Sequence, residues 1–127
     1  MTILTEGTRG YAFLVSEANG MYRSRQEVTV TVPANSTIVP GTIMGRITTG
    51  GKFVTQLAAA SNGSQNPAGL LLVPQTNDTG SAIDVMATIV ARDAEVVKTE
   101  ITYDPAANAA AILAADAALA ALGIIVR

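Results

Sequence analysis

The chain has 127 residues and a formal net charge of −2, only 14% of its residues are charged, and it contains no cysteine, histidine or tryptophan. These absences exclude disulfide scaffolds, thiol catalysis, zinc sites built on Cys or His, and every nucleophile that depends on a histidine base. With only eight Lys and Arg, the chain also lacks the positive field that holds nucleic acid. We therefore expect a single domain that is neither an enzyme nor a nucleic-acid-binding protein.

The low charge content itself carries information about the surface. An ordinary soluble domain has about 25% charged residues, and surfaces buried between subunits are depleted in charge. The composition therefore predicts a stable oligomer or a larger assembly. The alternative is a monomer whose exterior is neutral and rich in Thr, Ser and Asn.

Neither a membrane span nor a secretory signal is expected. The opening residues MTILTEGTR lack a basic stretch followed by an apolar core, so we expect a protein made in a cytosol or built into a particle there. Residues 106–126 are long enough to cross a bilayer. However, Asp116 near their middle would cost about 2.5–3.5 kcal/mol on insertion.

Residues 1–26 are expected to form an N-terminal arm, because glycines and charges interrupt them and no helical period appears. One strand-forming piece, residues 11–16, contains Phe13, which is one of only two phenylalanines in the chain. Phe13 and Val15 could anchor an edge strand of the domain or dock onto a different chain, and the sequence alone leaves both readings open.

From residue 27 the pattern is that of short strands divided by turn signals. Val28, Val30 and Val32 alternate with polar residues, which is typical of a strand with one buried face. Gly45 lies inside a later run and indicates a bulge or a close backbone approach, and Gly50-Gly51 is typical of a hairpin turn. Strands are predicted at residues 27–32, 37–39, 42–48, 52–57, 69–73, 82–91 and 95–103.

A single helix is predicted near the end of the chain. Asp104 is typical of an N-cap and Pro105 of the first helical position, and Gly123 stops the helix after about residue 122. Alanine covers most of this helix. Such a helix can pack closely against more than one partner, or it can belong to one domain and expose a face of small, weakly apolar residues. Residues 124–127 are a possible last strand. The expected fold is mainly β with one C-terminal helix, an α+β domain over residues 27–127 with the helix at about 105–122.

Chemistry-bearing clusters are weak in this sequence. Asp93, Glu95 and Glu100 could in principle form an acid–base pair or an oxygen-rich metal site, but Glu95 and Glu100 would point to opposite faces of a strand. Solvated carboxylates are the favoured interpretation. Arg23 and Arg25 could grip an anion, although a contact at the rim of an interface is favoured.

Several short pieces of the sequence carry a resemblance when they are taken in order. The pieces are residues 11–17 (YAFLVSE), 22–25 (YRSR), 40–47 (PGTIMGRI), 51–54 (GKFV), 68–72 (AGLLL), 92–96 (RDAEV) and 122–127 (LGIIVR). Each piece alone is weak, but the ordered set spans nearly the whole chain and resembles one family, the head decoration proteins of tailed bacteriophages, which includes the capsid-stabilising protein of phage lambda.

The resemblance implies a β-clip-like, sharply bent β core with a helix and no enzymatic activity. It implies a homotrimer on the outer surface of an expanded phage head, at local threefold positions between subunits of the major capsid protein. There it would act as a cement against the pressure of packaged DNA, with no cofactor, metal, nucleic acid or membrane involved. The N-terminal arm would add a strand to the capsid protein. The rival hypothesis is a small oligomeric β-rich binding module or adhesin displayed on a particle.

The arm and the helix are where we expect the contacts with the capsid and between protomers, although the helix is longer and richer in alanine than that of the lambda protein. The expected capsid-binding residues are Tyr11, Phe13, Leu14, Val15, Arg23 and Arg25. The expected oligomer interface uses three large apolar residues of the helix, Ile112, Leu119 and Leu122.

Overall fold

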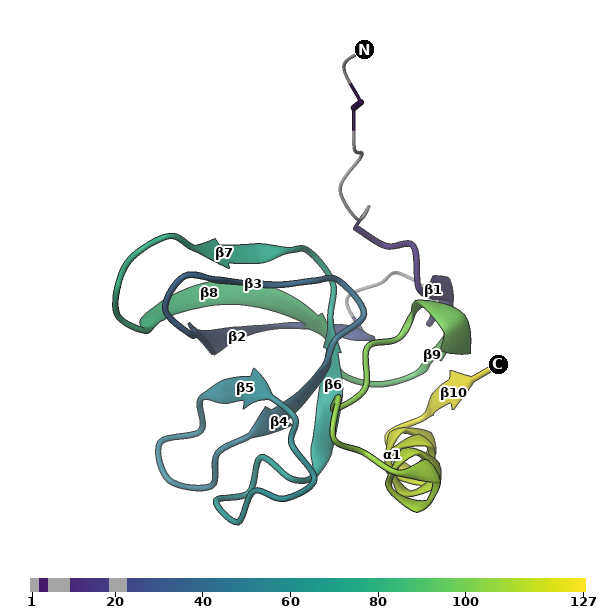
Figure 1. The fold of residues 1–127 in the computed structure, drawn as a ribbon. Coiled ribbons are helices and arrows are strands. Elements are labelled where there is room, and N and C mark those ends of the chain that lie inside the picture. Colours follow the sequence, from purple (N-terminus) through teal and green to yellow (C-terminus); the bar gives the residue numbers. More distant parts are fainter. Residues whose placement is uncertain (1–2, 5–9, 19–22) are drawn as a thin grey trace.

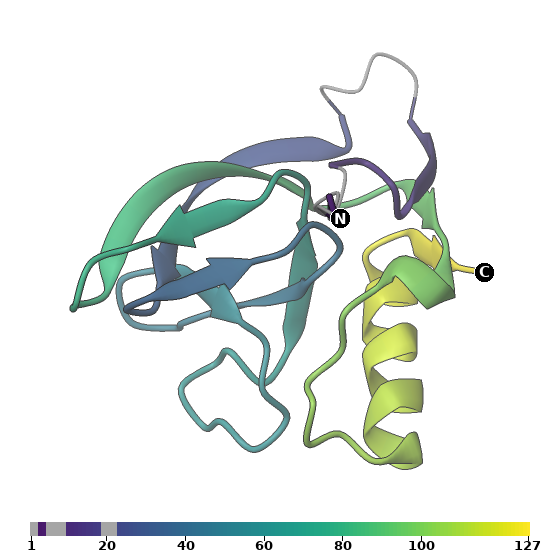
Figure 2. The ribbon, with the colours of Figure 1, turned by 45° about the horizontal axis from the view of Figure 1, so that its top comes forward.

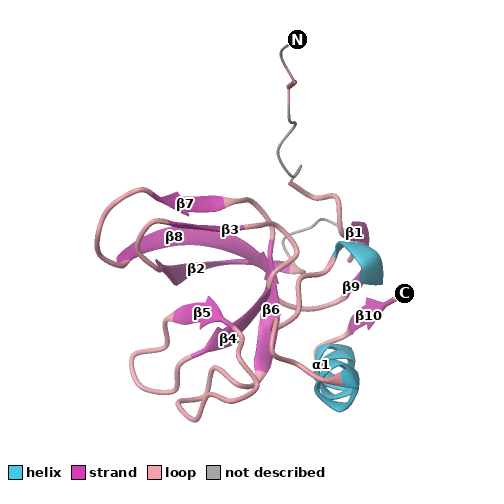
Figure 3. Cartoon of the chain, viewed as in Figure 1, coloured by secondary structure: helices cyan, strands magenta, loops and turns pink. Residues whose placement is uncertain are grey.

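The computed structural model describes residues 3–4, 10–18 and 23–127. Figures 1 and 3 show a group of curved strands on one side and a small sheet with one helix on the other. The predicted fold class, mainly β with a single C-terminal helix, is confirmed. The β core takes the form of a small closed barrel.

Five strands form the barrel, in the order β2-β5-β4-β6-β8, with β8 returning to β2. Its interior is filled by apolar side chains that alternate along the strands, as the pattern at Val28, Val30 and Val32 predicted. The strands are β2 (Arg25–Val32), β4 (Ile43–Arg46), β5 (Phe53–Thr55), β6 (Pro67–Leu71) and β8 (Ile83–Val90).

The barrel is closed unevenly. β2 and β8 pair as an antiparallel ladder over the full length of both strands. On its other side β2 meets β5 only at Val30, which pairs with Phe53 in parallel register. Among the described residues, the first half of β2 therefore has a neighbouring strand on one side only.

Gly45 confirms the expected irregularity in β4. The register between β4 and β6 shifts between Met44 and Gly45. A Cβ atom at Gly45 would lie 2.1 Å from the carbonyl oxygen of Ser64, so any side chain here would collide with the backbone of the loop that follows β5.

A two-stranded sheet, β3 (Ser36–Ile38) with β7 (Gln75–Asn77), lies beside the barrel. The sequence predicted only a loop at residues 74–80. Asn77 explains the order found there, because its buried amide donates to the carbonyl oxygens of Val32, Pro33 and Ser81. This one side chain thus ties the end of β2 to the loop after β7, a connection that hydrophobic periodicity does not reveal.

A three-stranded sheet contains the edge strand expected from residues 11–16, although the strand begins only at Leu14 and residues 11–13 form a turn. β1 (Leu14–Glu17) pairs antiparallel with β9 (Ala94–Val96), which in turn pairs in parallel with β10 (Ile124–Val126). The part of the predicted arm that runs from Phe13 to Glu17 is therefore integrated into the folded domain. The arm positions 1–2, 5–9 and 19–22 lie outside the described residues.

The predicted long strand at residues 95–103 is wrong. β9 ends at Val96, and the 3-10 helix η1 (Lys98–Glu100) follows it. Val96 and Ile101 are both buried in one core, yet a strand would place residues five apart on opposite faces. The tight turn at η1 brings both side chains to the same side.

The helix begins later than predicted. α1 spans Ala109–Ala121, and the side-chain oxygen of Asn108 accepts a hydrogen bond from the backbone N–H of Ala111. The carboxylate of Asp104 instead accepts from the N–H of Ala106, in a turn before the helix. Asp and Asn are both common N-cap residues, and in the structure Asn108, not Asp104, is the N-cap of α1.

Two apolar clusters hold the molecule together. One fills the barrel, and the other lies between the barrel, the three-stranded sheet and α1. Figure 2 shows α1 alongside the barrel and below the three-stranded sheet. Of the helices in the described residues, none is long and apolar enough to cross a membrane.

Candidate functional site

The segment around β1 divides its side chains between the surface and the core. The side chains of Tyr11 and Val15 are 48% and 52% exposed, whereas Phe13 between them is only 1% exposed. Leu14 is half-buried against the second cluster. The surface that this segment offers to another molecule is therefore made by Tyr11 and Val15.

Phe13 anchors the domain, as one of the two readings of the sequence expected. Its side chain belongs to the second apolar cluster, and its carbonyl oxygen accepts from the N–H of Val97 at 2.8 Å. Gly41 packs against it with φ +84°, and a Cβ atom at Gly41 would lie 2.5 Å from the carbonyl oxygen of Glu100. In this structure the Phe13 ring is not available to a partner.

The Arg25 side chain is engaged in contacts within the chain. Its guanidinium donates to both carboxylate oxygens of Glu17, at 2.6 and 2.8 Å, and the Ser24 hydroxyl donates to the same carboxylate at 2.7 Å. The hydrogen bond from Arg25 lowers the pKa of Glu17 from its ordinary value of 4.5, against an opposing effect of burial. Arg25 also lies 5.2 Å from the centre of the Tyr11 ring. The ion pair between Glu17 and Arg25 holds β1 to β2.

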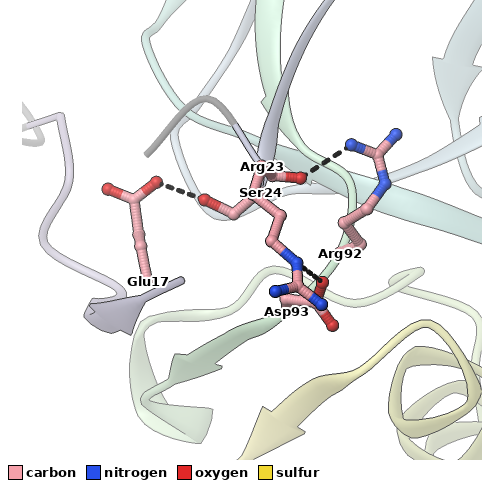
Figure 4. A network of polar contacts seen from close by, with 5 residues as sticks. All are labelled: Glu17, Arg23, Ser24, Arg92 and Asp93. Carbon is pink, nitrogen blue, oxygen red and sulfur yellow. Dashed lines mark hydrogen bonds and ion pairs between the residues drawn. The ribbon is translucent and has the colours of Figure 1, made fainter. Parts of the chain in front are cut away.

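Arg23 is more exposed than Arg25, and it takes part in a second network, shown in Figure 4. Its guanidinium donates to the Asp93 carboxylate at 3.1 Å, and its carbonyl oxygen accepts from Arg92 at 2.8 Å. Asp93 adopts φ +52° in the turn between β8 and β9. Such an exposed pair is weak, so the Arg23 guanidinium can be drawn away to another carboxylate.

The three helix residues predicted for an oligomer interface occupy different environments. Leu119 is fully buried in the second apolar cluster, and Leu122 packs against that cluster from a half-buried position. Ile112 is also half-buried, but Leu113 is 66% exposed. The outward face of α1 therefore presents Leu113 among alanines.

This outward face carries no charge, because the only acidic residue of α1 is turned inward. Asp116 accepts from the Tyr103 hydroxyl at 2.5 Å and from the Lys98 ammonium at 2.7 Å. Burial and the neighbouring Asp116 carboxylate raise the pKa of Tyr103 above its ordinary value of 10. Residues of α1 exposed to solvent are Ala109, Ala110, Leu113, Ala114, Ala117, Ala120 and Ala121.

The acidic candidates do not converge. Asp93 pairs with Arg23, Glu95 pairs with Arg127, and Glu100 ends η1. Across residues 3–4, 10–18 and 23–127, no group of three or more side chains is arranged to hold a metal ion. Solvated and ion-paired carboxylates remain the interpretation of these residues.

Exposed apolar residues that sequence reasoning did not select complete the surface. Ile3 and Leu4 are 80% and 91% exposed, and Ile125 on β10 is 44% exposed. Ile125 belongs to an alternating strand whose inward neighbour is Ile124, so a period-two signal was present there. For Ile3 and Leu4, the short sequence around them has no pattern that distinguishes a segment that binds a partner from the ordinary end of a domain.

The family model described as bacteriophage lambda head decoration protein D matches residues 3–124. A comparison with curated proteins finds no match.

Proposed function

The chain belongs to the family of the bacteriophage lambda head decoration protein D, and from this premise we propose that it is a capsid cement. It binds as a homotrimer to the outside of the expanded head, at local threefold positions between major capsid protein subunits. There it stabilises the shell against the pressure of packaged DNA. Family membership itself implies a structural protein associated with a phage capsid. The trimer, its position and its cementing role are the proposal.

The observation that carries the proposal is the family match over nearly the whole chain. The distribution of apolar surface supports it. Ile3, Leu4, Tyr11 and Val15 are exposed at and before the edge strand β1. Burying one large apolar side chain stabilises a complex by about 1.5–3 kcal/mol, so these four side chains suit a segment that is covered by another protein.

The outer face of α1 supports the trimer. It combines one exposed leucine with alanines and has no charge, which is the composition of a surface buried between subunits. We place the contact between protomers at Leu113 and its neighbouring alanines, with Ile112 and Leu122 at its margins. Leu119 serves the core of each protomer.

Binding linkage supplies the mechanism. A protein that binds only the mature lattice stabilises that lattice by RT ln(1 + [L]/Kd), about 4 kcal/mol at a thousandfold excess over Kd. A trimer engages three sites together, so avidity multiplies modest contacts at each arm. The N-terminal arm adds a strand to capsid protein elements, with Tyr11 and Val15 as the accessible side chains of its folded end.

The test removes residues 1–9, because a longer deletion would take away Phe13 and β1 and so unfold the domain. We expect the shortened protein to keep its oligomeric state and its melting temperature but to occupy expanded heads at least tenfold less. Occupancy is measured on purified heads without any sugar, which separates a cement from an adhesin.

A matched pair of variants controls for lost hydrophobicity. Ile3→Ser with Leu4→Ser should lower head occupancy, whereas Leu57→Ser with Val73→Ser, two exposed apolar residues outside the arm, should not. Equal occupancy of the shortened and full-length proteins would refute the role of the arm. Failure of the full-length protein to bind expanded heads would refute the function.

A further inference from the structure

A groove lies beside the first half of β2, and its lining extends to Arg92 and to Leu122 at the end of α1. It has a volume of about 740 Å³. Its floor includes Val28, Phe53 and Ala91, which are almost completely buried. Its rim includes Arg46, Lys52 and Arg92.

One wall of this groove is an open strand edge. Ser24 lies opposite Ala91 in the register of β2 with β8, and the N–H of Ala91 donates to the carbonyl oxygen of Ser24 at 2.8 Å. In an antiparallel ladder such bonded pairs alternate. The backbone groups of the even-numbered residues of β2 therefore point to β8, and those of Glu27 and Thr29 point to the other side.

That other side is unpaired over most of its length. β5 meets β2 only at Val30, and in the part of the chain that the structure describes no strand lies against residues 25–28 on this side. The edge thus offers the backbone N–H and C=O of Glu27 and the N–H of Thr29. Exposed strand edges of this kind template the addition of another strand.

The positive charge of the rim favours an added strand that carries negative charge. The guanidinium of Arg46 makes no hydrogen bond or ion pair with any of the described residues. Arg92 donates only to uncharged acceptors, the carbonyl oxygen of Arg23 and the side chain of Gln26. Lys52 is paired with Asp84. Two guanidinium groups without a carboxylate partner therefore flank the groove, in a chain whose net charge is −2.

We infer that this groove binds an extended, acidic segment of the capsid protein, which adds to the free edge of β2 as a strand. The segment presents alternate apolar side chains to Val28 and Phe53 and carboxylates to Arg46 and Arg92. The identity of the partner rests on the proposed function. The acidic character and extended form of the segment rest on the groove alone.

The first experiment probes the groove in the isolated, full-length protein. The probe is an eight-residue peptide in which valine and threonine alternate and which carries two glutamates; the matched probe carries lysines in their place. We expect the acidic peptide to shift the NMR amide signals of Glu27 and Thr29 and to slow their hydrogen exchange. The lysine peptide should leave these signals unchanged.

Charge variants test the rim. Arg46→Glu should weaken acidic-peptide binding at least threefold and lower the occupancy of expanded heads. It should not change the melting temperature, because the Arg46 side chain makes no hydrogen bond or ion pair with the described residues. Arg127→Glu, which changes an exposed arginine outside the groove, is the control and should leave peptide binding intact. Raising the salt concentration should weaken peptide binding further.

Two results would overturn the inference. One is an acidic peptide that leaves the Glu27 and Thr29 amides unchanged, or that binds the Arg46→Glu variant as well as the unaltered protein. The other is a single-stranded oligonucleotide that occupies the groove more tightly than the peptide. If the unaltered protein binds heads while either result holds, the proposed function survives and only the groove assignment fails.

Discussion

Glu17 and Arg25 join the three-stranded sheet to the barrel. Both oxygens of the Glu17 carboxylate, on β1, accept from the guanidinium of Arg25, on β2, at 2.6 and 2.8 Å. The two side chains are only 14% and 23% exposed. Hydrogen bonds between charged groups contribute more than neutral ones, so this pair is well placed to hold the edge strand β1 against the barrel.

Glu17→Gln should therefore destabilise the domain and loosen β1. The amide keeps the size of the side chain but loses the charge and one acceptor, and we expect the free energy of unfolding to fall by about 1–3 kcal/mol. Urea denaturation measures it. Glu95→Gln breaks the exposed pair with Arg127 and should change stability by less than about 0.5 kcal/mol. Equal losses in the two variants would contradict a special role for Glu17.

The same pair predicts a dependence on pH. The hydrogen bond from Arg25 lowers the pKa of Glu17 in the folded protein below its ordinary value of 4.5. A carboxyl group with a lowered folded pKa contributes stability above the unfolded pKa and loses it as the pH falls through the folded value. The difference in melting temperature between the unaltered protein and Glu17→Gln should thus be full near pH 7 and shrink below pH 4.5. A difference that stays constant down to pH 3 would contradict this assignment.

Gly45 gives a prediction about packing in the barrel. A Cβ atom at this position would lie 2.1 Å from the Ser64 carbonyl oxygen, so Gly45→Ala must displace backbone and should cost about 1–3 kcal/mol. Gly80→Ala is the control, because nothing lies within 4 Å of its Cβ position. It should be neutral or slightly stabilising. The melting temperatures of the two variants test this prediction. A Gly45→Ala protein with an unchanged melting temperature would rule out the close approach.

Local sequence signals predicted most of the barrel and failed where a buried polar side chain or a tight turn sets the path of the chain. The alternation at Val28, Val30 and Val32 identified β2, because each valine fills the same interior. β7 was missed because its order comes from the buried side chain of Asn77 rather than from apolar periodicity. The end of β9 was missed because Val96 and Ile101 share a core only through the turn at η1.

The candidate site was likewise predicted only in part from the sequence. Sequence alone indicated that residues 11–16 form a strand, but burial separated Phe13, which anchors the domain, from Tyr11 and Val15, which face solvent. On the helix, alanine surrounds every large residue, so no amphipathic pattern distinguishes Leu119 in the core from Leu113 outside. The two roles became distinguishable only once α1 was placed against the second apolar cluster.

Leu113 and Leu119 therefore provide a test of the trimer. Leu113 is 66% exposed, so Leu113→Glu should leave the stability of a single protomer within about 0.5 kcal/mol. The same substitution would place a charge in the proposed contact between protomers, and we expect it to shift the protein from trimer to monomer in light scattering.

Leu119→Ala is the matched contrast. It removes a fully buried side chain and should lower the free energy of unfolding by about 2–5 kcal/mol, without a charge at the contact. Met86→Glu alters another exposed apolar residue, on β8 and remote from α1 in sequence, and should leave the trimer intact. If Leu113→Glu remains a trimer while Met86→Glu dissociates, the contact between protomers lies on the β2–β8 surface, and the helix face is left for another partner.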